Sequence, residues 1–291
     1  MKAGYVALIG KPNVGKSTLL NALVGQKVSI VSDKPQTTRR KVLGIMHGDG
    51  FQIAFIDTPG IHEPHTALAK AMVEEAREAL GVVELAVVVC DASKRPDESD
   101  QRIAQLIGDS VPVYLVLNKM DKLRPEMVVP HVEAYTELYK TEDYMLTIAT
   151  QGVNLTQVVE QIVARLPESE PMYDEETFTD QPMRFIAAEM IREKVLIATR
   201  QEVPHATAVM VTEWEEVGDL VTIHAEIIVE KQGQKAILIG KQGSFLKTIG
   251  MQARKEIEEM TERRVYLELH VKVREDWRMN PRMVREIQEE S

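Results

Sequence analysis

Short apolar runs, rich in β-branched residues, alternate with helix-like segments over the first part of the chain. The runs occupy residues 5–9, 51–56, 85–90, 113–117 and 145–148. Between them, segments such as 70–80 and 153–166 repeat apolar residues every three or four positions, as one face of a helix requires. This alternation predicts an α/β fold over residues 1–166, with a mostly parallel sheet covered by helices.

The pattern stops at residues 167–182, where acidic side chains stand among Pro, Ser and Thr without any basic residue. Such a stretch predicts a linker between two domains, 1–166 and 183–291. In the second domain we expect a helix, two strands, a Gly-containing turn, a helix and a strand, at residues 183–200, 206–215, 220–230, 240–243, 244–261 and 265–273. This order predicts a smaller α+β domain with its helices on one face of the sheet.

Composition agrees with two globular domains, because 291 residues exceed the usual size of one core and 44% of them are hydrophobic. No run reaches the roughly 18 apolar residues that a membrane-spanning helix needs. The first residues show no signal-peptide pattern, so we expect a cytoplasmic protein. The single cysteine, Cys90, excludes an internal disulfide and a Cys-rich zinc site, and its apolar neighbours predict burial.

The formal net charge of −10 argues against indiscriminate attraction to phosphate polymers, and no DNA partner is expected. Contact with nucleic acid would have to be local. Residues 235–255 carry five Lys or Arg and no Asp or Glu, which makes this segment the candidate. A solvated helix face is the plainer interpretation of such a run.

Residues 10–17, GKPNVGKS, have the spacing G-x-x-x-x-G-K-[ST] between the apolar run 5–9 and a helix-like segment at 18–23. Glycines let backbone N–H groups turn inward around phosphate oxygens, and the helix N-terminus adds positive potential. We expect Lys16 to reach the β- and γ-phosphates and Ser17 to bind Mg²⁺. The residues predicted to contact nucleotide in this loop are Gly10, Asn13, Val14, Gly15, Lys16, Ser17 and Thr18.

The loop alone indicates a nucleoside triphosphate without naming the base. Asn118, Lys119 and Asp121 form N-K-x-D after the apolar run 113–117, at the edge of the sheet where ligands of open α/β folds bind. The Asp121 carboxylate would accept from N1–H and the exocyclic amine of guanine, a donor pair that adenine lacks. GTP is therefore favoured over ATP. An ATPase or kinase that uses this motif only structurally stays open at this point.

Asp57 and Gly60 belong to the run DTPG, directly after the apolar run 51–56. At a strand end, Asp57 would hold Mg²⁺ through water, and the N–H of Gly60 would bond the γ-phosphate.

The polar run 35–40, PQTTRR, lies between this motif and the P-loop. A threonine here can close onto Mg²⁺ when the γ-phosphate is present and leave after hydrolysis. Thr38 is favoured for this role, with Thr37 as the alternative. The predicted metal ligands are Ser17, Thr38 and Asp57, and the predicted catalytic residues are Lys16, Thr38 and Gly60.

Together these motifs resemble the translation-factor-related GTPases, and the runs 10–17 and 35–39 resemble the Era family in particular. The resemblance covers nearly the whole chain. It implies GTP and GDP as ligands and a fifth element behind the guanine, here TIATQG at 147–152. In that element the N–H of Ala149 would meet guanine O6, while Ile148 replaces the usual serine of the family.

Ile61 stands where Ras-like enzymes carry the glutamine that orients the attacking water, so we expect slow intrinsic turnover. Acceleration would come from an ion, a water network or a partner. By resemblance, Asn13 could hold K⁺ near the phosphates; a plain loop-turn role has equal weight. For His62, an exposed loop residue is favoured over a general base.

Residues 236–250, AILIGKQGSFLKTIG, resemble the Ile-Gly-Lys-x-Gly core of KH domains, with a strand edge or turn entering a helix. Gly240 and Gly243 let a phosphate backbone approach closely, and Lys241 and Lys247 offer charge. The predicted RNA-binding residues are Gly240, Lys241, Gln242, Gly243 and Lys247. The groove floor and core are expected from Ile237, Ile239, Leu246 and Ile249. The alternative is a tight turn with incidental lysines.

The predicted fold is a P-loop GTPase domain followed by a KH-like (type II) α+β domain. By resemblance, the RNA is single-stranded, near the 3′ end of 16S ribosomal RNA, and the role is assembly of the 30S ribosomal subunit. The competing function is a slow-hydrolysing, nucleotide-dependent scaffold on RNA. Peripheral association with the inner face of the cell membrane is a further expectation. Trp277 stays unassigned between packing on the KH core and touching RNA, although a tryptophan is more often a packing residue.

Overall fold

The computed structural model describes residues 1–34, 36–61, 63–200 and 203–290, with side chains through Gln288. The chain divides into two compact units, and the main boundary lies between Asp180 and Gln181. Pro35 and His62, which entered the sequence predictions, lie outside the described residues. Within those described, no helix is long and apolar enough to cross a bilayer.

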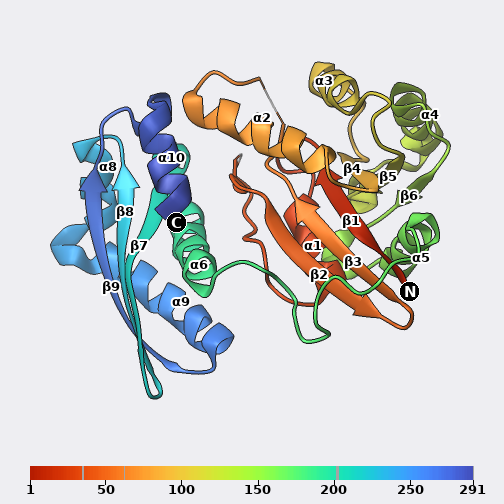
Figure 1. Ribbon diagram of the computed structural model, residues 1–291. Coiled ribbons are helices and arrows are strands. Elements are labelled where there is room, and N and C mark those ends of the chain that lie inside the picture. Colours follow the sequence, from red (N-terminus) through yellow and green to blue (C-terminus); the bar gives the residue numbers. More distant parts are fainter. Residues whose placement is uncertain (35, 62, 201–202, 291) are drawn as a thin grey trace. The chain divides into compact units, whose positions relative to one another are not determined.

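The first unit is built on a six-stranded sheet in the order β2-β3-β1-β4-β5-β6 (Figure 1). The strands are β1 (Lys2–Ile9), β2 (Val42–Gly48), β3 (Phe51–Asp57), β4 (Leu85–Asp91), β5 (Val113–Asn118) and β6 (Tyr144–Leu146). All neighbours pair in parallel except β2 and β3. The mostly parallel sheet is thus confirmed, and the carboxyl ends of β1, β3, β4 and β5 meet at one edge.

Helices cover both faces of this sheet, as βαβ connections require (Figure 1). They are α1 (Lys16–Val24), α2 (Ala67–Leu80), α3 (Glu98–Ile107), α4 (Val128–Tyr139) and α5 (Leu155–Arg165). Val6 and Leu8 pack with α1 and α5, whereas Ala7 and Ile9 pack with α2, α3 and α4. Successive strand residues point to opposite faces, so the continuous apolar runs fill two cores at once.

Residues 167–180 lie along the first unit although their composition predicts a linker. The N–H of Ile45 in β2 donates to the carbonyl oxygen of Phe178 at 2.8 Å, and the Thr179 hydroxyl donates to that of Leu43 at 2.6 Å. The Gln52 side chain in β3 accepts the N–H of Met172 at 2.7 Å. Edge-strand backbone groups of β2 therefore find partners in this segment, which belongs to the first compact unit.

The second unit is built on a three-stranded sheet in the order β7-β8-β9. Its elements are α6 (Met183–Ala198), α7 (Val203–Ala206), β7 (Ala208–Val217), β8 (Leu220–Val229), α8 (Gln232–Ile239), α9 (Ser244–Thr261), β9 (Arg264–Val273) and α10 (Pro281–Glu290). Strands β7 and β8 are antiparallel, and β8 and β9 are parallel. Along β8, Val221, Ile223, Ala225 and Ile227 are buried, while the residues between them are half-buried.

The strand edge or turn expected before the G-x-x-G is wrong, because residues 236–239 form the end of helix α8. Gln234 and Leu238, four positions apart, share the buried face. The Gln234 side chain also accepts the N–H of Glu230 at 2.9 Å at the start of the helix. Ile237 is 56% exposed and is not a core residue, whereas Ile249 is buried as expected.

Trp277 is a packing residue of the second unit. Its side chain is 1% exposed, and its indole N–H donates to the carbonyl oxygen of Ala206 at 2.9 Å. A buried indole with its one donor satisfied contributes to the core and has no face free for a base.

Candidate nucleotide site

The loop at residues 10–17 leads from β1 into α1 and has two tightly enclosed glycines. A Cβ on Gly10 would lie 2.3 Å from the carbonyl oxygen of Val89, and one on Gly15 would lie 2.3 Å from Nδ2 of Asn118. Gly15 also has φ +105° and caps α1 without a side chain, so the first N–H groups of the helix stay available to an anion. The sequence therefore needs glycine at both positions.

Lys16 is buried at the start of α1, where its ammonium donates to the carbonyl oxygens of Gly10 and Lys11, both at 3.0 Å. Burial lowers the pKa of Lys16 to about 8, and the nearby Asp57 carboxylate opposes this shift. A desolvated ammonium ringed by carbonyl oxygens is ready to pair with an anion. This is the environment expected for a lysine that meets the β- and γ-phosphates.

Ser17, Thr38 and Asp57 come together, as predicted for metal ligands. The Ser17 hydroxyl donates to Oδ2 of Asp57 at 2.6 Å and lies 2.8 Å from Oγ1 of Thr38. Thr38 also donates to the same Oδ2 at 3.3 Å, which favours Thr38 over Thr37. Burial raises the pKa of Asp57, while Lys16 and the hydroxyl donors oppose that shift.

The other oxygen of Asp57, Oδ1, is buried without a hydrogen-bond partner among the described residues. A buried carboxylate oxygen left unpaired is costly unless a ligand supplies the missing contact. Two hydroxyls and a carboxylate are also the oxygen donors that Mg²⁺ prefers. The residues present therefore fit a magnesium site.

Asn118 connects the three loops around the base site. Its Nδ2 donates to the carbonyl oxygen of Val14 at 3.0 Å, while its Oδ1 accepts from the Thr147 hydroxyl at 3.2 Å and from the N–H of Ala149 at 3.0 Å. The Ala149 N–H was expected to face guanine O6. That contact stays a prediction, and it requires this N–H to be shared with Asn118.

Lys119 ties the same loop to the P-loop, because its ammonium donates to the carbonyl oxygen of Asn13 and to Oδ2 of Asp91. Asp91 closes β4 and was not singled out in the sequence, since one Asp after a strand carries no motif. Asp121 follows in the short helix η1 (Met120–Lys122) and is exposed, with its carboxylate accessible to a ligand.

The DTPG run abuts the P-loop. The N–H of Ile61 donates to the carbonyl oxygen of Gly10 at 3.2 Å, and a Cβ on Gly60 would lie 2.7 Å from backbone atoms of Pro12. Ile61 is 6% exposed and apolar, so it cannot orient a water. Asn13 has φ +63°, a left-handed conformation that supports the turn interpretation beside the K⁺ hypothesis.

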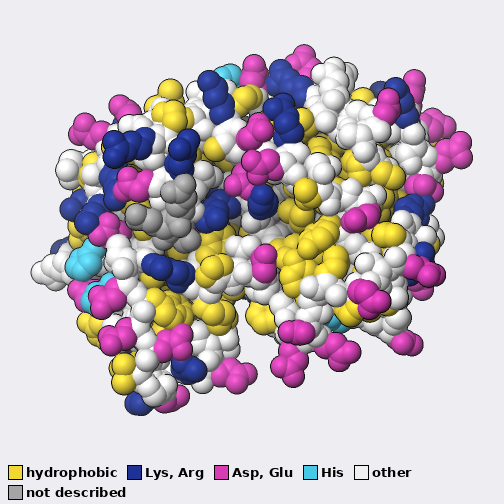
Figure 2. Space-filling model, in the orientation of Figure 1, with side chains coloured by type: hydrophobic (Ala, Val, Ile, Leu, Met, Phe, Trp, Pro, Cys, Tyr) yellow, Lys and Arg dark blue, Asp and Glu magenta, His cyan; other side chains and the backbone are white. Residues whose placement is uncertain are grey.

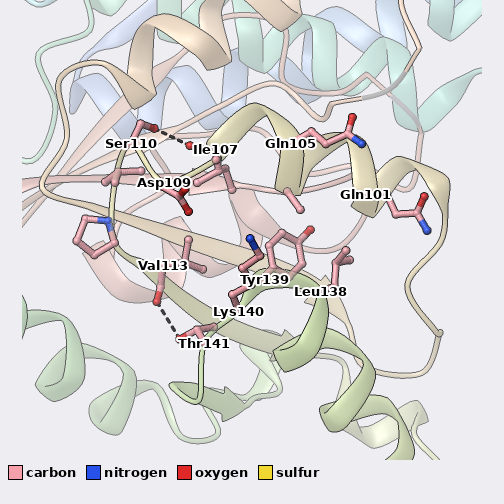
Figure 3. A pocket seen from close by; sticks show the side chains of 14 residues that line it. Gln101, Gln105, Ile107, Asp109, Ser110, Val113, Leu138, Tyr139, Lys140 and Thr141 are labelled. Atoms are coloured by element: carbon pink, nitrogen blue, oxygen red, sulfur yellow. Dashed lines mark hydrogen bonds between the residues drawn. The ribbon is translucent and has the colours of Figure 1, made fainter.

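A hollow of about 780 Å³ in the first unit lies elsewhere, between α3 and α4 (Figure 3). Gln101, Gln105, Tyr139 and Lys140 line it, and the Ser110 hydroxyl donates to the carbonyl oxygen of Ile107 at 2.6 Å. Its lining includes none of the predicted site residues among those described. It is therefore separate from the nucleotide site.

Two family models match the chain. Residues 5–119 match the model described as 50S ribosome-binding GTPase, and residues 202–278 match the KH domain. Over 288 residues the chain is 46% identical to GTPase Era of Heliobacterium modesticaldum, covering 98% of this chain and 96% of that protein. The chain belongs to the Era family of GTPases. Membership makes the protein a GTPase that uses guanine nucleotides and Mg²⁺, which removes the ATPase and kinase alternative.

Other Era proteins agree. GTPase Era of Geobacter metallireducens is 45% identical over 289 residues, covering 98% of this chain and 97% of that protein. A crystal structure of Era with MgGDPNP and nucleotides 1506–1542 of 16S ribosomal RNA is 43% identical, with a TM-score of 0.95, and covers 99% of this chain and 98% of that one. An Aquifex aeolicus Era variant bound to GDP·AlF4⁻ is also 43% identical, with a TM-score of 0.94 and 99% of each chain covered.

The KH domain of this chain presents its G-x-x-G as an exposed turn between α8 and α9. Gly240, Gln242 and Gly243 all have positive φ, and Lys241 and Lys247 are exposed. Figure 2 shows Lys and Arg side chains gathered over α8.

Beside the turn lies a groove of about 400 Å³. It is lined by Gly243, Leu246, Lys247, Gly250, Met251, Arg254, Leu267, Glu268 and Leu269. Leu267 and Leu269 of β9 were missed in the sequence, because only the fold brings this strand beside α9.

Proposed function

We propose that this chain is a GTP-hydrolysing switch that binds single-stranded RNA near the 3′ end of 16S ribosomal RNA and acts in assembly of the 30S subunit. The loop network around Asn118, which joins the P-loop to the guanine-site loops, carries the nucleotide half of the proposal. The exposed G-x-x-G and its groove support the RNA half. The Era crystal structure with 16S nucleotides supports the choice of RNA.

The nucleotide residues have distinct proposed roles. Gly10, Asn13, Val14, Gly15 and Thr18 would offer backbone groups to the phosphates, and Lys16 would leave its carbonyl partners to bind phosphate oxygens. Ser17, Thr38 and Asp57 would hold Mg²⁺, which when bound offsets phosphate charge. The N–H of Gly60 would bond the γ-phosphate. Water would then attack the γ-phosphate in line while its bond to the β–γ bridging oxygen breaks, which releases phosphate and GDP, with Lys16 stabilising the developing charge.

Guanine selection is assigned to Asp121, together with Asn118, Lys119 and Ala149. Competition between GTP and ATP for binding tests this assignment. Comparable affinities for the two nucleotides would contradict it. In Asp121→Asn, preference should move towards xanthine nucleotides, because an amide offers a donor where the carboxylate accepted. Asp109→Asn, an exposed change at the separate hollow, is the matched control and should leave the preference unchanged.

Phosphate release under multiple turnover, with and without 30S subunits, separates the switch from the slow-hydrolysing scaffold. Measurable turnover that subunits accelerate supports the switch. Turnover too slow to cycle in both conditions supports the scaffold. Equal rates in KCl and NaCl would remove the proposed K⁺ contact of Asn13.

RNA binding is assigned to Gly240, Lys241, Gln242, Gly243 and Lys247. Gly243→Asp should abolish RNA binding and leave GTP affinity intact, because it adds a side chain and a negative charge where the phosphate backbone approaches. Unchanged RNA binding would refute the clamp. Crosslinking and sequencing of RNA bound to the GTP-loaded form identifies the RNA segment.

The location of the protein is also a proposal. We place the protein in the cytoplasm, with a fraction of its molecules bound peripherally at the inner face of the cell membrane. Co-sedimentation with vesicles containing anionic lipid tests the membrane part, and absence from the pellet at low salt would remove it.

A further inference from the structure

Ser29 contacts the carboxylate of Asp57 although it lies outside every nucleotide-binding motif. Its hydroxyl donates to Oδ2 of Asp57 at 2.9 Å, and its side chain is buried, with 3% of the residue exposed. Ser17 and Thr38 donate to the same oxygen. One oxygen of Asp57 therefore receives three hydroxyl donors, while Oδ1 is left without a partner among the described residues.

Ser29 is itself held in place by Asn21 of α1. The Asn21 side chain accepts the N–H groups of Val28 and Ser29, both at 3.0 Å, and donates to the carbonyl oxygen of Ser29 at 2.7 Å. Asn21 follows Ser17 by four residues, one helical turn along α1. The helix that carries an expected metal ligand thus also fixes the backbone of Ser29.

The three hydroxyls differ in what else they are expected to do. Ser17 and Thr38 are proposed ligands of Mg²⁺, and Thr38 is expected to leave when the γ-phosphate is lost. Ser29 has neither task, so its hydrogen bond to Asp57 can persist in both nucleotide states. Groups that orient a metal-binding carboxylate in this way set its affinity for the metal.

We propose that Ser29 is a positioning residue, which fixes the Asp57 carboxylate beside Ser17 and Thr38 at the metal site, with Asn21 fixing Ser29. The inference rests on the proposed roles of Ser17, Thr38 and Asp57 in binding Mg²⁺. Its consequence is a tighter hold on Mg²⁺ and, through the metal, on nucleotide. Nucleotide binding without metal should not depend on Ser29.

The test follows release of fluorescent GDP from the full chain over a range of Mg²⁺ concentrations and in EDTA. In Ser29→Ala, the Mg²⁺ concentration that gives half-maximal retention should rise by about tenfold, with GDP affinity in EDTA unchanged. Ser29→Thr keeps a hydroxyl and should restore the wild-type midpoint. Ser110→Ala, which removes a serine hydroxyl at the hollow of Figure 3, is the matched control and should behave like wild type.

Asp57→Asn separates this inference from the proposed site. If Asp57→Asn shifts the Mg²⁺ midpoint and Ser29→Ala does not, the role of Ser29 is wrong and the metal site stands. If Asp57→Asn has no effect, the metal site itself is wrong. An equal loss of GDP affinity with Mg²⁺ and in EDTA would make Ser29 merely structural. Should Ser29→Ala not fold, Asn21→Asp, which loses the donor to the Ser29 carbonyl, must shift the midpoint in the same direction or the inference fails.

Discussion

Two glycine turns that each begin a helix, residues 10–17 and 240–243, are built differently. Gly15 and Gly243 both have positive φ and both precede the first residue of a helix. A Cβ on Gly15 would lie 2.3 Å from Nδ2 of Asn118, whereas one on Gly243 would meet no heavy atom within 4 Å among the described residues beyond its chain neighbours. The first turn is enclosed at both Gly10 and Gly15, whereas the second is open at Gly243 and is closed at Gly240 only by Phe245 of its own helix.

The lysines of the two turns differ in the same way. Lys16 is 5% exposed, while Lys241 and Lys247 are exposed. A desolvated charge in a preformed cradle fits one small ligand with defined oxygen positions. Hydrated charges on an open turn fit the repeated phosphates of a polymer, where counterion release contributes much of the affinity. Burial thus provides selectivity in one turn, and exposure provides adaptability in the other.

Adding a methyl group to each turn should give the largest contrast. Gly15→Ala should weaken GTP binding more than about 100-fold, because the Cβ overlaps Asn118 and the backbone is strained at φ +105°. Gly243→Ala meets open space and should weaken RNA binding by less than about tenfold, the cost of backbone strain alone. Titration of fluorescent GTP and of labelled RNA measures both. Similar losses in the two variants would contradict the comparison.

Removing the exposed charges of the second turn should have an intermediate effect, which lowers RNA affinity and leaves GTP affinity unchanged. In Lys241→Ala with Lys247→Ala, RNA affinity should fall by roughly 10- to 30-fold at low salt. The slope of log affinity against log salt should become shallower by about 1.4, or about 0.7 for each charge. Anisotropy of labelled RNA over a salt series measures this, with GTP affinity as the internal control. An unchanged slope would mean that these lysines do not contact phosphate.

Changing the pH should have the smallest effect on ligand affinity. It should act through the buried Lys16 and therefore on GTP binding only. The pKa of Lys16 is about 8 in the folded, nucleotide-free protein and 10.5 when unperturbed. Stability of that form should therefore rise between pH 8 and 10.5, where only the unfolded chain keeps the proton.

A bound triphosphate should restore that proton, so GTP affinity should fall by about fourfold from pH 7 to 8.5. Calorimetry of GTP binding in buffers with different ionisation enthalpies measures the proton taken up. Binding at pH 8.5 without proton uptake would show that Lys16 is already charged. RNA affinity should stay level over this range.

Local patterns predicted most of the fold. The helix at 244–261 was predicted to the residue, and the strand at 51–56 to within one residue. The antiparallel strand β2 was missed because Gly44 interrupts a short apolar run. A Cβ on that glycine would lie 2.7 Å from Cδ1 of Leu20 in α1, a close approach that only the fold reveals. The helical end of α8 was missed because four consecutive apolar residues also fit a strand.

The candidate site likewise contains residues that sequence motifs predicted and residues that only the structure revealed. Lys16, Thr38 and Asp57 belong to spaced motifs, so the sequence placed them before their side chains could be seen together. Ser29 and Asp91 act through single hydrogen bonds to Asp57 and Lys119 across the fold. The sequence does not predict these two contacts, because the residues of each pair are far apart in the chain and meet only in the folded structure.

Residues 178–179, which lie along β2, also keep this edge strand from pairing with another copy of the protein. An outer strand with bare N–H and C=O groups is a template on which another molecule can extend the sheet and start aggregation. In the first unit one edge strand, β2, is hydrogen-bonded to the carbonyl oxygen of Phe178 and to the hydroxyl of Thr179. The other edge strand, β6, is only three residues long. Deleting Phe178 and Thr179 would therefore expose the backbone of β2, and we expect such a variant to self-associate.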